Sequence, residues 1–145
     1  MNKKIVVDIY SDYVCPFCYM GKVNLENAIK ELKMEDEVEV NFKAYELDEQ
    51  APKDKEMLKY DSLVENSEKP IGVIMSETRE VIEQAKDVGL EFNYDIMLTA
   101  NTRNAHKLTK YAKTKGKQKE FATKVMEAYF TKGANLNSEK ELVKL

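Results

Sequence analysis

The chain opens with blocks of apolar and polar positions that predict a β-α-β unit. Residues 4–10 form an almost continuous apolar and β-branched run, which is typical of a strand buried on both faces. Residues 16–33 carry apolar side chains at helical spacing and predict an amphipathic helix. Residues 38–44 alternate between apolar and polar, as a strand with one polar face does. Because a helix joins the two strands, we expect them to lie parallel.

The rest of the chain predicts helices. Residues 46–56 are acidic and indicate a loop, and residues 57–66 fit either a short helix or a loop. A capping-box pattern, with Ser138 followed by Glu141, predicts that a last helix begins near residue 138. Between residues 66 and 138, apolar side chains recur at helical spacing in three segments, and a glycine ends or follows each of them. These segments are residues 71–89, 98–115 and 118–132.

Two features of this pattern indicate that something C-terminal is missing. Only two strands are convincing, and an isolated pair of strands is marginally stable in water. The helical pattern that begins at Ser138 also reaches Leu145 without a glycine, a proline or a polar tail. We therefore expect unpaired sheet edges, which invite pairing between two chains in a homodimer.

Composition and charge restrict the class of protein. The length of 145 residues suits one domain, and 43% apolar with 34% charged residues indicates a globular protein with a solvated surface. A formal charge of −3 argues against a nucleic-acid-binding protein. The charged start, residues 1–4, precedes too few apolar residues for a secretory signal, and no segment is apolar over the length of a membrane span. We therefore expect a cytoplasmic protein without a membrane partner.

Both cysteines lie at the predicted start of the first helix, in the sequence Cys15-Pro16-Phe17-Cys18. Proline suits the first helical position, so we expect Cys15 at the N-cap and Cys18 at the third helical position. The free N–H groups and the positive end of the helix dipole favour the thiolate of Cys15, and such positions lower a cysteine pKa from about 8.5 to about 3.5–7.5. This predicts that Cys15 attacks and that Cys18 resolves the mixed disulfide.

A single Cys-x-x-Cys motif has other interpretations. Two cysteines and one histidine are too few for a structural zinc site within one chain, because such a site takes four ligands. A zinc ion shared across a dimer and two packed core thiols remain as alternatives. The order strand, Cys-x-x-Cys, helix favours redox chemistry, which needs no metal and no organic cofactor.

Three segments carry a family resemblance. Residues 12–22, DYVCPFCYMGK, are similar to a D-x-x-C-P-W-C-Y-x-G-K signature, with Phe17 in place of the usual tryptophan. Residues 100–108, ANTRNAHKL, are similar to N-T-x-x-A-H-x-L, and residues 128–133 match A-Y-F-x-x-G. The chain thus resembles the cytosolic DsbA-like thiol oxidoreductases of the FrnE type. Their superfamily includes kappa-class glutathione transferases and 2-hydroxychromene-2-carboxylate isomerases, in which a serine usually stands at the position of Cys15.

The resemblance implies an α/β protein with a thioredoxin-like fold and a large helical insertion. Residues 1–54 would form the N-terminal part of the thioredoxin domain, and residues 55–145 the helical insertion domain. In the family, a loop with a cis-proline opposite the cysteines follows, and then two strands and a final helix. No such segment occurs in this sequence, so the chain is similar to the first two thirds of a family member.

The resemblance also implies substrate-binding roles for Pro16, Phe17, Asn101 and His106. The alternatives for two of them are structural. A single histidine on a helical stripe more often fixes packing through one hydrogen bond, which we favour for His106, and Asn101 can cap the helix that begins near it.

Three charged residues near the motif also have two interpretations each. Asp12 either raises the thiol pKa or stabilises the turn before the helix, and we favour the turn. Asp8 is either a buried proton acceptor or a solvated strand residue. Lys22 matches the motif, and a solvated lysine is the default expectation.

We therefore predict a thiol–disulfide oxidoreductase that acts on protein or small-molecule thiols, with glutathione as a candidate redox partner. A glutathione-dependent transferase or isomerase is the rival enzyme class. A non-catalytic helical binding module with an idle thiol pair is the third hypothesis.

Overall fold

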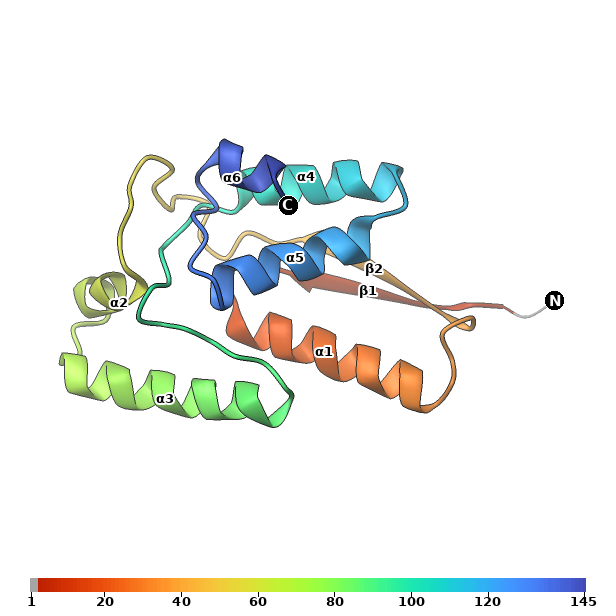
Figure 1. The fold of residues 1–145 in the computed structure, drawn as a ribbon, viewed down its shortest axis with the longest axis horizontal. Helices are drawn as coiled ribbons and strands as arrows, with labels where there is room; N and C mark the ends of the chain where they lie inside the picture. The colour runs from red at the N-terminus through yellow and green to blue at the C-terminus, as the bar shows by residue number, and fades with distance from the viewer. Residues whose placement is uncertain (1–2) are drawn as a thin grey trace.

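The computed structural model describes residues 3–145 of the chain; positions 1 and 2, which belong to the predicted N-terminal unit and its charged start, lie outside the described residues. A strand, a helix and a second strand are followed by helices, as the sequence predicts (Figure 1). The elements are β1 (Ile5–Ser11), α1 (Pro16–Glu31), β2 (Val38–Ala44), α2 (Lys59–Ser67), α3 (Ile71–Asp87), α4 (Arg103–Thr114), α5 (Gln118–Phe130) and α6 (Glu139–Val143).

The strands β1 and β2 form a parallel two-stranded sheet, which confirms the predicted β-α-β unit. Ile9 pairs with Phe42 in the register of the two strands. The side-chain amide of Gln118, at the start of α5, accepts a hydrogen bond from the N–H of Phe42 and donates one to its carbonyl, both at 3.2 Å. The ammonium of Lys22 on α1 lies 5.8 Å from the centre of the Phe42 ring. Helix α1 therefore lies over the face of the sheet that carries the Phe42 side chain, and the start of α5 bonds to the backbone of β2.

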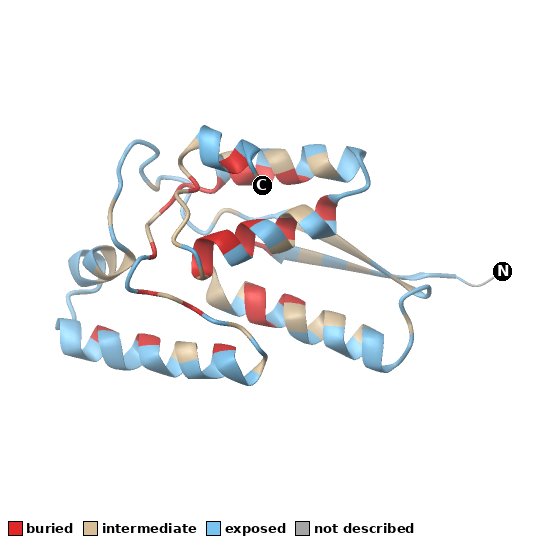
Figure 2. Ribbon diagram, viewed as in Figure 1, coloured by how far each residue is buried: buried red, intermediate tan, exposed pale blue. Residues whose placement is uncertain are grey.

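The expectation that the first strand is buried on both faces is wrong. Val6 and Tyr10 are 55% and 69% exposed, and β1 is largely pale blue in Figure 2. Successive side chains of a strand point to opposite faces. Val6 and Tyr10 are therefore on the face opposite to Ile9, and they point away from α1. Among the described residues nothing pairs with the outer edge of β1. Pairing of two chains through this surface stays a prediction.

The helix that the sequence predicts from residue 98 begins later than expected. The segment 57–66 resolves as a helix, α2, but the helix expected from residue 98 begins only at Arg103. Leu98 forms an isolated antiparallel bridge with Leu58 instead, because the N–H of Lys59 donates to Met97 O at 2.7 Å. This long-range pairing holds the chain before α4 in an extended conformation.

The last helix begins at the predicted cap. Ser138 is the N-cap of α6, and its hydroxyl accepts a hydrogen bond from the N–H of Glu141 at 3.2 Å. The carboxylate of Glu141 accepts from the N–H of Asn135 at 2.7 Å rather than from Ser138. The capping box is thus half formed within α6 and half used to fix the loop before it.

An aromatic cluster joins α1 to the helical part of the chain. Tyr19 stacks on Phe92 with ring centres 5.9 Å apart, and Phe92 stacks on Phe130 of α5 at 4.7 Å. Tyr19 also contacts Phe130 directly, with ring centres 5.7 Å apart, so it packs between α1 and α5. Residue 54, the predicted domain boundary, lies in the connection between β2 and α2, and the division into two domains stays a prediction. No helix within residues 3–145 is both long enough and apolar enough to cross a membrane.

Candidate redox site

The four residues between β1 and α1 place Cys15 at the N-cap of α1. Its backbone is extended, with φ −95° and ψ 112°, and Pro16 occupies the first helical turn. The Sγ atom of Cys15 accepts a hydrogen bond from the N–H of Cys18 at 3.3 Å. This is the placement that the sequence predicts, and the sulfur takes up one of the N–H groups that a helix start leaves without a partner.

The two thiols are free and partly accessible. Cys15 and Cys18 are both half-buried, and no disulfide joins them. Phe17, between them, is 58% exposed, while Pro16 is half-buried. The motif therefore offers an apolar side chain beside two reachable sulfurs, but the substrate-binding role of Pro16 and Phe17 stays a prediction.

The two sulfurs titrate as a pair. The thiol of Cys15 donates a hydrogen bond to the sulfur of Cys18, which lowers the pKa of Cys18 to about 6 and raises that of Cys15. Burial opposes this lowering at Cys18, and the N–H of Asp12 and the hydroxyl of Ser11 add to it. The pair therefore loses its first proton with a lowered pKa, and the resulting negative charge is shared between the two sulfurs. The remaining proton can lie on either sulfur of the pair. When it lies on Cys18, Cys15 is the thiolate.

Asp12 fixes the turn before α1, as the favoured interpretation holds. It is 2% exposed, and its carboxylate accepts hydrogen bonds from the N–H groups of Tyr13 and Leu47, both at 2.8 Å. Burial acts to raise the pKa of Asp12, but hydrogen bonds from His106, Thr102 and Leu47 outweigh it, so the pKa is lowered. A buried carboxylate with these donors remains charged at neutral pH.

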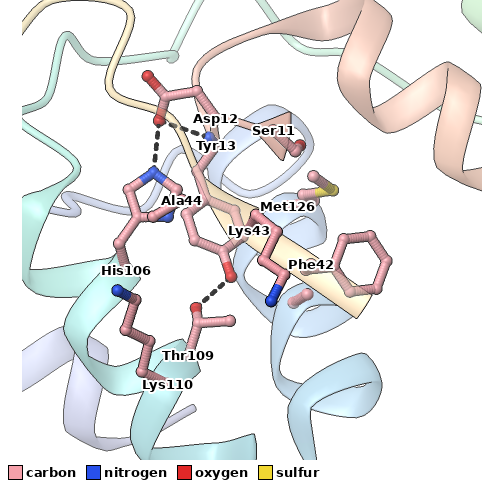
Figure 3. Close-up of a pocket in the computed structure, with 11 residues that line it drawn as sticks. Ser11, Asp12, Tyr13, Phe42, Lys43, Ala44, His106, Thr109, Lys110 and Met126 are labelled. Carbon is pink, nitrogen blue, oxygen red and sulfur yellow. Dashed lines mark hydrogen bonds and ion pairs between the residues drawn. The ribbon is translucent and has the colours of Figure 1, made fainter. Parts of the chain in front are cut away.

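His106 belongs to the same cluster, which Figure 3 shows. Its Nε2 lies 3.0 Å from Oδ1 of Asp12, and its ring stacks on that of Tyr13 with centres 5.1 Å apart. The hydroxyl of Tyr13 in turn contacts that of Thr109 on α4. The resembling segments 12–22 and 100–108 therefore meet at Asp12 and His106. The structural interpretation of His106 is confirmed, and contact with substrate stays a prediction.

Asn101 is a second buried contact point of the 100–108 segment. Its Nδ2 donates to the carbonyl of Ala51 at 2.9 Å, and its Oδ1 accepts the N–H of Arg103, the first residue of α4. Its own N–H donates to Oδ1 of Asn137 at 2.9 Å, and Asn137 Nδ2 donates to the carbonyl of Pro52. The N-cap position of α4 is Thr102, and Asn101, one residue earlier, accepts the first N–H of the helix and also holds the loop after β2. A substrate-binding role for it stays a prediction.

Two charged residues near the motif are placed differently from each other. Lys22 is buried rather than solvated, which corrects the default expectation: its ammonium donates to Glu26 and, at 2.7 Å, to Thr123 on α5. Its spacing one turn beyond Cys18 was the available signal, since that places it on the side of α1 that carries the motif. Asp8 is exposed and accepts from Asn41 at 3.2 Å, so it is the solvated strand residue.

No three histidine, cysteine, aspartate or glutamate side chains within residues 3–145 gather where they could hold a metal ion. A pocket of about 310 Å³ lies beside the motif, where Val14 forms one wall and Met57, Lys59, Thr99 and Ala100 form others. Sequence patterns gave no sign of this pocket, because its walls come from three segments that are distant along the chain.

Comparison with known proteins gives similarity along the whole chain. Over 140 residues it is 31% identical to YwbO, an uncharacterized protein of Bacillus subtilis (strain 168), and the match covers 96% of this chain and 63% of that protein. The structure is similar to the crystal structure of a probable DsbA oxidoreductase from Streptomyces coelicolor, with a TM-score of 0.89 and 26% sequence identity. That match covers 97% of this chain and 60% of the other. The chain therefore spans about three fifths of the length of these relatives.

The family model of the DsbA-like thioredoxin domain matches residues 6–145, which include the cysteine motif, the 100–108 segment and all helices. With the structural similarity, this match confirms the mixed α/β, thioredoxin-like fold that the resemblance implied. The chain belongs to the family of DsbA-like thioredoxin domains.

Proposed function

We propose that Cys15 and Cys18 carry out thiol–disulfide exchange with protein or small-molecule thiols. The observation that carries this proposal is the pair of free, half-buried thiols at the start of α1, which share one proton so that the first is lost with a pKa of about 6. A thiolate is thereby present at neutral pH, and the thiolate is the attacking species in disulfide exchange. Membership of the DsbA-like family supports an oxidoreductase, and so does the description of the Streptomyces relative as a probable DsbA oxidoreductase.

The exchange proceeds in two displacement steps. The Cys15 thiolate, formed when the shared proton lies on Cys18, attacks one sulfur of a substrate disulfide; a bond to that sulfur forms, and the other substrate sulfur leaves as a thiolate. Cys18 then loses its proton to that leaving thiolate or to water and attacks Sγ of Cys15. The Cys15–Cys18 disulfide forms, and the second substrate thiolate is released. Two electrons pass from the protein thiols to the substrate, and the reverse sequence oxidises a substrate dithiol.

Two surfaces beside the sulfurs support binding of a thiol substrate. Phe17 is exposed between the cysteines and offers apolar contact, and the pocket next to Val14 offers space for a substrate group. The pocket combines apolar walls with the amine of Lys59 and the hydroxyl of Thr99. This mixture suits small molecules such as glutathione as well as a peptide segment, so we propose both classes as partners.

The test uses the 145-residue chain and glutathione disulfide as the probe. The Cys15→Ser variant should lose exchange, because it lacks the attacking sulfur. The Cys18→Ser variant should accumulate a mixed disulfide with glutathione, visible by mass spectrometry, and should fail to turn over. Exchange by Cys15→Ser at the rate of the parent chain would refute the assigned roles.

The same variants separate this function from the rival enzyme class. A glutathione-dependent transferase or isomerase needs one sulfur or hydroxyl near its glutathione, so Cys18→Ser would retain full activity on a small electrophile. A parent chain that reacts with neither probe, and whose thiols titrate near the ~8.5 of free cysteine, would support the non-catalytic binding module.

A further inference from the structure

Lys59, the first residue of α2, has no carboxylate paired with its ammonium among residues 3–145. Its side chain is half-buried and lines the pocket beside the motif. The other charged residues that line this pocket are all exposed: Asp48, Lys55 and Glu65. Charges that are removed from water are normally paired, so the position of this ammonium needs a reason.

The fold fixes the direction of the Lys59 side chain. The N–H of Lys59 donates to Met97 O at 2.7 Å, and the N–H of Thr99 donates to Met57 O at 2.8 Å. Leu58 between them is extended, with φ −62° and ψ 141°, so Met57 and Lys59 point to one side and Leu58 to the other. Met57 and Lys59 both line the pocket, whereas Leu58 is 42% exposed. Pairing with the segment before α4 therefore holds the lysine against the pocket.

The carboxylates near Lys59 do not offset its burial. Burial lowers the pKa of its amine, and Asp12 and Asp48 act in the opposite direction without cancelling this effect. Both carboxylates have other partners: Asp12 accepts from the N–H of Leu47, and Asp48 accepts from the N–H of Gln50 at 3.0 Å. An anion in the pocket would supply a counter-charge, and a hydrogen bond between two charged groups is roughly twice as strong as a neutral one.

We propose that Lys59 binds a carboxylate of the substrate, so that the thiol pair prefers disulfides that carry a carboxylate near their sulfurs. The inference rests on the proposed exchange function. Val14, which forms one wall of the pocket, directly precedes Cys15, so the pocket lies next to the residue that attacks. Its volume of about 310 Å³ suits a small thiol compound or one acidic side chain of a peptide. Both sources supply the same carboxylate.

The alternative role of Lys59 is structural, with its apolar stem covering the pocket wall and its charge without a function. Lys59→Met keeps most of this stem and removes the charge, whereas Lys59→Arg keeps the charge. Lys53→Met is the matched control, because Lys53 is an exposed lysine of the same loop that does not line the pocket. It changes the net charge of the chain by the same amount.

The experiment measures exchange by the reduced 145-residue chain with glutathione disulfide and with its ester, in which every carboxylate is blocked. Both probes have the same disulfide and the same amines, so the ratio of their rate constants reports the effect of the carboxylates. We expect this ratio to be about five- to tenfold higher in the parent than in Lys59→Met. Lys59→Arg and Lys53→Met should keep the ratio of the parent. An equal ratio in the parent and in Lys59→Met would overturn the proposal for glutathione.

A second pair of probes identifies the source of the carboxylate. One is a short peptide disulfide with glutamate beside the cysteine, and the other has glutamine at that position. A preference for the glutamate peptide that Lys59→Met loses would assign the pocket to acidic protein segments. A preference that occurs only with glutathione disulfide would assign it to small thiols, and no preference with either pair would overturn the role of Lys59.

A binding measurement keeps this proposal separate from the proposed function. The S-methyl derivatives of glutathione and of the glutamate peptide keep their carboxylates but cannot exchange, and NMR titration follows their binding. We expect the dissociation constant of at least one of them to rise several-fold in Lys59→Met and to stay unchanged in Lys53→Met. Circular dichroism checks that each variant is folded. A parent without exchange refutes the proposed function, while this titration still decides on Lys59.

Discussion

Replacing Asp12 should reveal how much of the stability of this chain depends on the turn before the cysteines. The carboxylate is 2% exposed and accepts hydrogen bonds from the N–H groups of Tyr13 and Leu47 and from Nε2 of His106. Asp12→Ala removes both acceptor oxygens and leaves three donors without their acceptor, and each buried donor left unpaired costs about 1–3 kcal/mol. Some of these donors can reach water after relaxation, so we expect a total loss of about 3–5 kcal/mol in the free energy of unfolding.

Asp12→Asn should cost less than Asp12→Ala. Its amide has nearly the same size as the carboxylate and keeps one acceptor oxygen, but its NH₂ group must face a donor, either Leu47 or the pair of Tyr13 and His106. We expect a loss of about 1–3 kcal/mol. Urea unfolding of the reduced chain at neutral pH measures both variants. The control is Asp8→Ala, an exposed carboxylate that should change the unfolding free energy by less than about 0.5 kcal/mol.

The pH dependence gives this prediction a sign. The pKa of Asp12 is lowered from 3.8 in the folded chain, so the carboxylate stabilises the fold fully above its unfolded pKa. That contribution is lost as the pH falls through the lower, folded pKa. The difference between the parent and Asp12→Asn should therefore be largest near neutral pH and shrink below about pH 4. A loss smaller than about 1 kcal/mol for Asp12→Ala, or a difference that does not change with pH, would refute this reasoning.

Two further predictions concern motif residues on and after the helices. Gly133→Ala should destabilise the chain by about 1–3 kcal/mol, because Gly133 has φ +69° and an added Cβ would lie 3.0 Å from the carbonyl oxygen of Ile96. Gly21→Ala in α1 should instead stabilise the chain by about 0.5–1 kcal/mol, because a Cβ there meets nothing within 4 Å. Thermal unfolding measures both, and shifts of the same sign would contradict the distinction. Lys22→Ala should cost about 2–4 kcal/mol in urea unfolding, because it removes a buried stem and the ammonium that Glu26 binds, whereas Lys30→Ala on the exposed side of α1 should be nearly silent.

The features that the sequence predicts well depend on neighbours along the chain. The β-α-β unit follows from the change of hydrophobic period from strand to helix and back. The caps at Cys15 and Ser138 follow from a side chain and a backbone N–H three residues apart. In each case the interacting groups are fixed within one helical turn, so the pattern contains the geometry.

The features that the sequence does not predict depend on contacts between segments that are distant along the chain. Whether Val6 and Tyr10 are covered is decided by helices that begin far along the chain, and an apolar run has the same appearance in either case. Leu98 has helical spacing with its neighbours, yet its bridge to Leu58 keeps it extended. Lys22 has the composition of a surface residue, but Thr123 of α5 lies over it and supplies a partner. Tertiary contacts outweigh local preference at all of these positions.

The cysteine pair shows both effects at one site. The helix start predicts a thiolate on Cys15, and the N–H of Cys18 does donate to that sulfur. The end of β1 brings further groups to the other sulfur, with Ser11 and the N–H of Asp12 stabilising charge on Cys18 while the Asp12 carboxylate opposes it. Donors at the helix start act on Cys15 and donors at the end of β1 act on Cys18, so the two sulfurs share one negative charge. Cys15 can attack a substrate disulfide when the remaining proton lies on Cys18.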